Sequence, residues 1–395
     1  MTVQHTISQL ASQCVLCGLC IPHCPTYRVF HTENESPRGR ISLFKALADG
    51  DLSLSDPLFE TLDHCLGCRA CESMCPSQVN YSKISDLSRQ LLAETIQSQQ
   101  SVKQKIAQSV LQNRSLRSLA KLSGQLMKKG QPSLAEYYPV DNAIGQVLLF
   151  TGCTGELFET QTLLDGIVLL NACGYNVLIP EAQQCCGAIK RRQGDLDGMY
   201  QQMHQNIEAF TPLLKNSQAI ISLNNHCSGQ LREYHVLMVG DDSETVAKHS
   251  FDIITFLQHA LEKKKMSFQP LEHKILLHTS CSLKNVLQEE SALQSLLEQI
   301  PGSGIHKLDA QICCGAAGSY RLQYPEIADQ LLDDKIKQIV VYNKSTLLVS
   351  SNLGCSMHYK QGLKKQGLDI EIIHPVSLLA RQLSLKKSFV DTGSF

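Results

Sequence analysis

The sequence lacks a strong excess of charge of either sign, and it lacks long apolar runs. It has 36 lysine and arginine residues against 37 aspartate and glutamate residues, a net charge of -1. Nothing in this balance indicates a nucleic-acid partner. No uninterrupted apolar run reaches the roughly 18 residues of a membrane span, and residues 1–7 lack the pattern of a signal peptide. We therefore expect a cytoplasmic protein.

The sequence also lacks the common fingerprints of nucleotide binding. It contains no G-x-G-x-x-G and no P-loop motif, so we expect no nicotinamide, flavin or nucleotide site on this chain. A length of 395 residues predicts two or three domains, and 43% hydrophobic residues are typical of a globular protein.

Cysteine, in contrast, is abundant, with 17 residues. A reducing compartment keeps thiols free, which favours metal or redox roles over disulfides. Two runs share the spacing C-x2-C-x2-C-x3-C followed by proline, which is the signature of bacterial ferredoxins. The first run is Cys14, Cys17, Cys20, Cys24 and Pro25, and the second is Cys65, Cys68, Cys71, Cys75 and Pro76.

This spacing predicts two [4Fe-4S] clusters with crossed ligation. Three closely spaced thiolates reach one cluster, while the fourth cysteine of each run ligates the cluster of the other run. Gly18 and Gly67 allow backbone amides to approach the sulfurs. A pair of four-cysteine zinc sites is the alternative, but zinc requires neither the third cysteine nor the terminal Cys-Pro. The predicted ligands are Cys14, Cys17, Cys20 and Cys75 for cluster 1, and Cys65, Cys68, Cys71 and Cys24 for cluster 2.

The long segment between the two runs contains a predicted helix, because apolar residues recur at helical spacing from Ile41 to Leu47. Such an insert is typical of helical ferredoxin modules rather than of small β-rich ferredoxins. Arg38 and Arg40 stand at the start of this helix. Two interpretations of them stay open, a solvated helix start or a role around the clusters or at a partner.

Residues 95–135 contain seven basic residues and no acidic one. Apolar residues at helical intervals predict a basic amphipathic linker, either solvated between domains or docked on an acidic partner or anionic lipid. The basic residues are Lys103, Lys105, Arg114, Arg117, Lys121, Lys128 and Lys129. The apolar ones are Ile106, Val110, Leu119, Leu122 and Leu126.

The remainder of the chain is an internal repeat, because four cysteines recur at one constant offset in the sequence. Apolar runs precede the first and last cysteines of each copy, which predicts parallel strands with cysteines just past their carboxyl ends. We expect two α/β lobes that face each other across a thiol-lined cleft. The repeated cysteines are Cys153, Cys185, Cys186 and Cys227 in the first lobe, and Cys281, Cys313, Cys314 and Cys355 in the second.

The role of the repeated cysteines has two open interpretations. The four thiols of a lobe hold a third iron-sulfur cluster, or they form a redox site without one. Packing as small hydrophobes would not account for their duplication. His358, which follows Cys355 closely, is either a ligand or an ordinary polar residue. Cys173 has no counterpart in the repeat and is predicted to be a core thiol.

Together these patterns predict an α+β multidomain protein with an N-terminal α-helical dicluster ferredoxin module and two duplicated α/β Cys-Cys-Gly lobes with small parallel sheets. The predicted domains are a two-cluster domain at 1–95, a basic helical linker at 96–145, a first lobe at 146–270 and a second lobe at 271–395.

Over nearly its whole length the sequence resembles the iron-sulfur subunit of bacterial glycolate oxidase. Matching segments besides the cysteine runs include Pro37-Arg38-Gly39-Arg40, Cys185-Cys186-Gly187-Ala188 and Asn352-Leu353-Gly354-Cys355. The resemblance implies an electron-transfer subunit that is not catalytic alone. It implies a flavoprotein partner that oxidises glycolate to glyoxylate, and a membrane quinone or another acceptor. The implied location is the cytoplasm or the cytoplasmic face of the inner membrane.

Related Cys-Cys-Gly proteins provide the alternatives. They include the iron-sulfur subunits of lactate utilisation and of anaerobic glycerol-3-phosphate dehydrogenase, and heterodisulfide reductase, in which such a motif binds a non-cubane cluster. That enzyme ends its motif in C-x-x-C, whereas Gln230 and His358 take the place of the last cysteine here. A lactate-utilisation subunit, a thiol/disulfide enzyme and a metal-stabilised scaffold are therefore the alternative functions.

Overall fold

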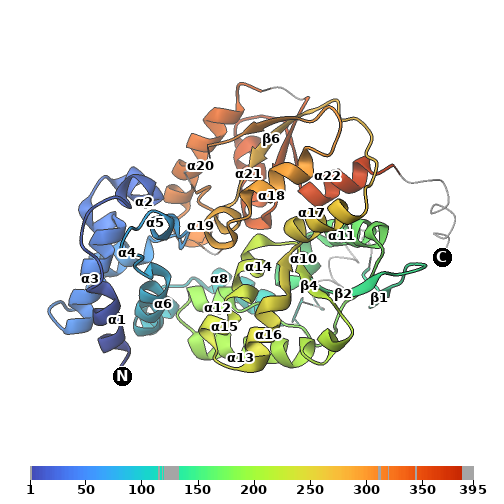
Figure 1. Cartoon of the computed structure of the whole chain (residues 1–395). Coiled ribbons are helices and arrows are strands. Elements are labelled where there is room, and N and C mark those ends of the chain that lie inside the picture. The colour runs from blue at the N-terminus through green and yellow to red at the C-terminus, as the bar shows by residue number, and fades with distance from the viewer. Residues whose placement is uncertain are drawn as a thin grey trace.

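The structure is a computed structural model that describes residues 2–113, 116, 117, 119, 133–309, 313–318, 320–342 and 345–384. A helical N-terminal module, blue in Figure 1, lies beside two α/β lobes, one mostly green and the other orange to red. This arrangement confirms the predicted fold class. The predicted domain boundaries at 95, 145 and 270 stay predictions.

The N-terminal module is a group of helices around one apolar core, in which Ile7, Phe44 and Phe59 are fully buried. The helix predicted around residues 41–47 is the centre of α3, which begins where Ser36 Oγ accepts a hydrogen bond from Gly39 N at 3.0 Å. The helices are α1 (Val3–Ala11), α2 (Pro25–Phe30), α3 (Pro37–Asp49), α4 (Asp56–Asp63), α5 (Ala70–Ser73), α6 (Tyr81–Leu91), α7 (Ala93–Ser98) and α8 (Val102–Gln112), with 3-10 turns at Ile21–His23 and Glu33–Glu35.

The first lobe has a sheet of order β1-β3-β2-β4-β5, in which only β1 is antiparallel. Its central strands are apolar because helices cover both faces of the sheet. The strands are β1 (Tyr137–Tyr138), β2 (Gly145–Phe150), β3 (Tyr175–Leu178), β4 (Ala219–Ser222) and β5 (Ser250–Asp252). The helices are α10 (Gly152–Phe158), α11 (Thr160–Cys173), α12 (Ala188–Arg192), α13 (Leu196–Phe210), α14 (Asn225–Arg232), α15 (Tyr234–Leu237), α16 (Asp241–His249) and α17 (Ile253–Lys263), with a 3-10 turn at Leu213–Lys215.

The second lobe repeats this topology in a fully parallel sheet of order β7-β6-β8-β9. In both lobes the first long strand lies in the middle and carries the first cysteine just beyond its end. The strands are β6 (Lys274–His278), β7 (Gly304–Lys307), β8 (Thr346–Ser350) and β9 (Glu371–Ile373). A π-helical turn spans Ser282–Leu287, and the helices are α18 (Glu290–Leu297), α19 (Tyr320–Gln323), α20 (Pro325–Ile339), α21 (Leu353–Lys365) and α22 (Pro375–Gln382).

The two lobes pack directly against each other. One apolar cluster runs through both, with α11, α17, α18 and α22 between the sheets, and it includes the predicted core thiol Cys173. At the carboxyl ends of the strands, Asn225 Oδ1 accepts hydrogen bonds from Ser280 Oγ at 3.0 Å and Ser351 Oγ at 2.6 Å. The expectation of an open, thiol-lined cleft is therefore wrong for the described residues, because apolar and polar side chains fill this interface.

The predicted amphipathic linker does not bury the apolar residues that its sequence pattern led us to expect. On α8 the buried residues are Gln104 and Gln108, whereas Ile106 is 60% exposed, and Leu119 is 62% exposed. Gln108 hydrogen-bonds Gln193 of the first lobe, and Leu111 at the end of α8 packs against that lobe's apolar cluster, so both amide and apolar contacts hold this helix. Arg114, Lys121, Leu122, Leu126, Lys128 and Lys129 lie outside the described residues. Within the described part of the chain, no helix has the length and apolar character needed to cross a bilayer.

Candidate iron-sulfur centres

The cysteines of the two ferredoxin-type runs line two adjoining hollows, which we call hollow 1 and hollow 2. The space within them, part of which is open to solvent, measures about 430 and 340 Å³. The thiols of hollow 1 belong to Cys14, Cys17, Cys20, Cys71 and Cys75, and those of hollow 2 to Cys24, Cys65, Cys68 and Cys71. Cys71 borders both, so the hollows share a wall. Each lining contains the four cysteines that the sequence predicts as ligands of one cluster.

The donor set of each hollow fits an iron-sulfur cofactor, because four thiolates are what a [4Fe-4S] cluster requires. The fit depends on chain segments that are far apart in sequence. The first run follows the end of α1, and the second surrounds α5, while α3 and α6 supply Arg40 and Tyr81 to the walls. Contacts of α1 with both α3 and α6 hold these segments together.

The electrostatic surroundings differ between the thiols of hollow 2. Burial would raise the pKa of Cys65, but the guanidinium groups of Arg40 and Arg89 outweigh it and lower this pKa. For Cys68 and Cys71, burial and then the neighbouring cysteines raise the pKa well above the ordinary value. Such thiols lose their protons only when a metal binds to the sulfur atoms.

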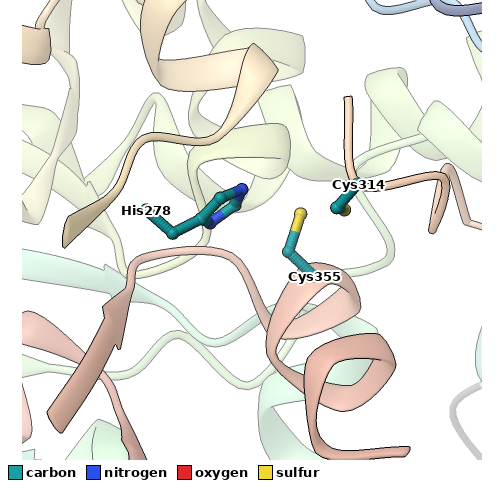
Figure 2. Close-up of side chains that lie close together, drawn as sticks. All are labelled: His278, Cys314 and Cys355. Carbon is teal, nitrogen blue, oxygen red and sulfur yellow. The ribbon is translucent and has the colours of Figure 1, made fainter. Parts of the chain in front are cut away.

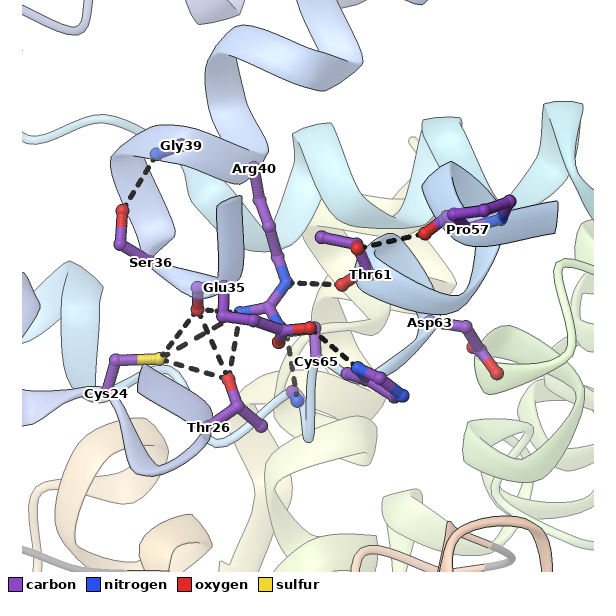
Figure 3. A network of polar contacts seen from close by, with 12 residues as sticks. Cys24, Thr26, Glu35, Ser36, Gly39, Arg40, Pro57, Thr61, Asp63 and Cys65 are labelled. Atoms are coloured by element: carbon purple, nitrogen blue, oxygen red, sulfur yellow. Dashed lines mark hydrogen bonds and ion pairs between the residues drawn. The ribbon is translucent and has the colours of Figure 1, made fainter. Parts of the chain in front are cut away.

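Arg40 is a buried cation beside hollow 2, only 1% exposed (Figure 3). It forms an ion pair with Glu35, and it donates to Thr26 Oγ1 at 2.9 Å and to Thr61 O at 2.9 Å. Its Nη1 lies 3.9 Å from Cys24 Sγ. Of the two interpretations left open for Arg40, the structure therefore excludes a solvated helix start.

Arg38 holds the loop of the first cysteine run. Its Nη1 donates to Leu16 O at 2.7 Å, and its Nε donates to Glu33 Oε1 at 2.7 Å. Leu16 has a φ of 56° and Gly18 a φ of 82°, so this loop is tightly turned. The positive φ of Gly18 explains why a glycine stands there, and Arg38 Nη1 lies only 2.7 Å from where a Cβ would be.

The first lobe brings its four repeated cysteines together in a buried apolar environment. Cys153 is the second residue of α10, and its sulfur lies 3.6 Å from that of Cys185. Gly187, with a φ of 95°, provides the turn after the cysteine pair. Phe150, the last residue of β2, packs in the same apolar cluster. The four cysteines, all buried, are Cys153, Cys185, Cys186 and Cys227.

The second lobe adds a histidine to its cysteines. The ligand atoms of His278, Cys314 and Cys355 all lie within 4.8 Å of one another, and all three side chains are buried. Figure 2 shows the imidazole at the end of β6 facing the two cysteines, which come from the loop before α19 and from the start of α21. Burial, and then Lys335, lowers the pKa of His278 to about 3, which keeps the ring neutral.

Sequence reasoning missed His278, and for His358 it left two interpretations open, a ligand or an ordinary polar residue. His358 is buried in α21, but its ring Nε2 lies 3.5 Å from Asp329, and it is not in the group of His278 with the two cysteines. The signal for His278 was present in the repeat, because Phe150 occupies the matching place in the first copy. The repeat was recognised from cysteines that are the same in both copies, so a histidine that is present in only one copy was not found in this way.

The second lobe's thiols adjoin hollow 2. Cys68 packs in one apolar cluster with Cys281 and Cys313. Asn285 Nδ2, in the π-helical turn after Cys281, donates to Cys68 O at 2.8 Å. The N-terminal module also contacts the first lobe through ion pairs, including that between Arg69 and Glu233. Hollow 2 therefore lies between hollow 1 and the thiols of the second lobe.

Comparison with known proteins agrees with this construction. A 4Fe-4S dicluster domain matches residues 10–79, and a cysteine-rich domain matches twice, at residues 147–232 and 275–360. The probable glycolate oxidase iron-sulfur subunit of Bacillus subtilis (strain 168) is 29% identical over 426 residues, which cover 95% of this chain and 94% of that protein.

Two further relatives have similar identity. The glycolate oxidase iron-sulfur subunit of Escherichia coli (strain K12) is 26% identical over 372 residues, 87% of this chain and 88% of that protein. Lactate utilization protein A 2 of Bacillus cereus (strain Q1) is 27% identical over 246 residues, 60% of this chain and 99% of that protein.

Fold, hollows and matches define the class of this protein: a 4Fe-4S dicluster domain joined to two cysteine-rich domains. Within this class, the chain is similar to the glycolate oxidase iron-sulfur subunits and to lactate utilization protein A, which agrees with the resemblance found in the sequence.

Proposed function

We propose that this chain is the electron-transfer subunit of a flavin-dependent 2-hydroxyacid dehydrogenase, with glycolate as the substrate of the complex. The chain accepts electrons from a flavoprotein partner and passes them to a membrane quinone or another acceptor. The names of the two relatives that cover most of this chain, 95% and 87% of it, support glycolate. The name of the third relative supports lactate as the second candidate.

The observation that carries the proposal is the row of thiol sites. Hollow 1 and hollow 2 share Cys71, and Cys68 of hollow 2 packs against Cys281 and Cys313. When bound at the hollows, [4Fe-4S] clusters supply one-electron redox chemistry. Sites that share walls support transfer of single electrons along the chain. A dehydrogenase reaction removes two electrons, so the proposal assigns the flavin to the partner.

The chain's own residues would hold and adjust the two clusters. The crossed cysteine sets are the proposed ligands, Cys14, Cys17, Cys20 and Cys75 at hollow 1, and Cys65, Cys68, Cys71 and Cys24 at hollow 2. Arg40 and Arg89 place positive charge beside Cys65 and favour its thiolate form. At hollow 2, buried apolar wall residues such as Leu66 lower the local dielectric, which strengthens these interactions.

Cluster content is the first test. The full chain, purified without oxygen, should contain about eight iron atoms and a similar amount of acid-labile sulfide from the two hollows. Reduction by dithionite should produce the electron paramagnetic resonance signal of two interacting clusters. Stoichiometric zinc without sulfide would contradict the proposal and favour the metal-stabilised scaffold.

Reconstitution is the second test. The chain alone should not reduce a dye with glycolate or lactate, and adding the flavoprotein partner should restore transfer to the clusters. Comparison of glycolate with lactate in the same mixture identifies the substrate. Reduction of a quinone analogue tests the proposed acceptor. Substrate-dependent dye reduction by the chain alone would refute the relay and favour a catalytic thiol site.

A further inference from the structure

Three donors in the second lobe converge although they come from separate segments. His278 ends β6, Cys314 lies between β7 and α19, and Cys355 is in the first turn of α21. Their ligand atoms are all within 4.8 Å of one another (Figure 2). The donors of a tetrahedral metal site with thiolate and imidazole ligands lie roughly 3.5 to 3.8 Å apart. Small side-chain rotations are therefore enough to bring these three atoms to one metal.

The first lobe does not have the same donors. Phe150 ends β2, where His278 ends β6 in the second lobe. The helices α13 and α20 both have 15 residues, and their eleventh residues are Asn206 and Lys335. Both of these residues are buried. The duplication has therefore diverged at two buried positions beside the cysteines, and both changes introduce a titratable nitrogen in the second lobe only.

The surroundings of His278 hold the ring in place. Its Nδ1 lies 3.0 Å from Ser350 Oγ at the end of β8, which leaves Nε2 as the nitrogen for a metal. The Tyr359 ring packs edge-on against it, with centroids 5.0 Å apart. The buried Tyr359 hydroxyl has no hydrogen-bond partner in the described structure, which indicates a missing acceptor beside the cysteines.

The charge of the site is balanced from within the protein. Lys335 is 1% exposed, and its ammonium group interacts first with the carboxylate of Asp309 and then with Cys313, Cys314 and Cys355. Thiolates that bind a divalent metal leave residual negative charge, and a buried cation offsets it. At the matching position the first lobe has neutral Asn206, which donates to Cys185 O at 3.0 Å, and the buried guanidinium of Arg117 is the cation that interacts with Cys153 and Cys185 there.

We propose that the second lobe binds a thiophilic transition metal through Cys314, Cys355 and Nε2 of His278, and that the first lobe does not have this site. Cys281 and Cys313, the other two repeated cysteines of the second lobe, lie next to this site. A single zinc ion and the iron of an iron-sulfur cluster share this ligand chemistry. The site does not depend on the electron-transfer proposal, because its ligands are separate from those of the two hollows.

The test compares metal content between matched variants of the full chain, purified without oxygen. Zinc, iron and acid-labile sulfide are counted per chain. Wild type should contain metal beyond that of the two hollows, either about one zinc or additional iron with sulfide. His278→Phe and Cys355→Ser should lose this extra metal. Cys227→Ser, the same change in the first lobe, and His306→Phe, an exposed histidine on β7, should keep it.

Two controls keep the result interpretable. His278→Phe introduces the residue that the first lobe already accommodates, and the paramagnetic signal of the two-cluster module reports whether each variant has folded. X-ray absorption at the edge of the extra metal in wild type requires no variant. It should reveal one nitrogen ligand among sulfur ligands.

Three results would overturn the inference. They are a shell of sulfur alone around the extra metal, equal metal loss in Cys227→Ser and Cys355→Ser, and wild-type protein without metal beyond the two hollows. Each of these results leaves the cluster count of the two hollows unchanged, so it is distinct from a failure of the relay proposal.

Discussion

Replacing Arg40 with methionine should destabilise the N-terminal module strongly. Arg40 is 1% exposed and pairs with Glu35, whose side chain is 6% exposed. Removing one partner of a buried ion pair costs about 3 to 5 kcal/mol, because the other charge stays buried without compensation. Thr61 O, which accepts from Arg40 Nε at 2.9 Å, loses its donor too. His64 Nδ1 stays 2.7 Å from Glu35 Oε1 and compensates only part of the charge.

The loss can be measured by anaerobic urea titration, followed through the visible absorption of the clusters. With a slope of about 3 kcal/mol per molar urea, the midpoint should fall by roughly 1 to 2 M. Lys45→Met is the matched control on the same helix, because its exposed pair with Asp49 contributes at most about 0.5 kcal/mol. Arg40→Lys keeps the charge but loses the planar fork of donors, so its midpoint should lie between the two.

The same variant has a redox consequence. A buried cation beside hollow 2 favours the more negative, reduced state of a cluster bound there. Arg40→Met should therefore lower the midpoint potential of cluster 2, while that of cluster 1 changes less. Equal urea midpoints for Arg40→Met and Lys45→Met, with unchanged potentials, would refute this reasoning.

Three further predictions concern the ligands, the start of α3 and a buried carboxyl group. Cys24→Ala should remove the signal of cluster 2 and retain that of cluster 1, and loss of cluster 1 alone would contradict crossed ligation. Gly39→Ala should cost about 1 to 3 kcal/mol in the same urea assay, because the added Cβ would lie 2.0 Å from Glu33 O. Its control is Gly304→Ala, where the space is open, and equal midpoints would exclude the clash. Burial raises the pKa of Glu159 to about 7. The folded protein therefore binds more protons than the unfolded chain between pH 4.5 and 7, and stability falls as the pH rises through this window. Between pH 5 and 8 the free energy of unfolding should therefore fall by on the order of 2 kcal/mol because of Glu159, and Glu159→Gln should not show this part of the fall. Thermal unfolding at pH 5 and 8 measures it, and an equal pH dependence in both proteins would contradict the burial argument.

The parts that could be predicted from the sequence are those encoded by local spacing. The C-x2-C-x2-C-x3-C runs were enough to predict which four thiols gather at each hollow, because short loops leave few conformations. Apolar periodicity located α3 and the strands before Cys153 and Cys281, because burial of a helix stripe or a strand depends on nearby residues. The constant offset between the repeated cysteines was enough to predict two duplicated α/β lobes, and the structure adds that their strands have the same order.

The linker shows where local pattern fails. Ile106 continued a helical apolar pattern, yet it is 60% exposed, while Gln104 and Gln108 are buried. The buried face of α8 depends on what lies opposite, and in this fold Gln193 offers an amide to it. Hydrophobicity alone cannot select a face when the neighbouring surface is polar.

Only the tertiary structure decided what surrounds each cysteine. His278 reaches Cys314 and Cys355 because β6, the loop before α19 and α21 meet at one edge of the second sheet. Cys68 meets Cys281 because the module packs on the second lobe, although the whole first lobe separates them in the sequence. Arg40 is buried because α3 and α4 close over it, where it donates to Thr61. Such contacts join distant segments, and their partners follow from packing of the whole chain rather than from any local spacing.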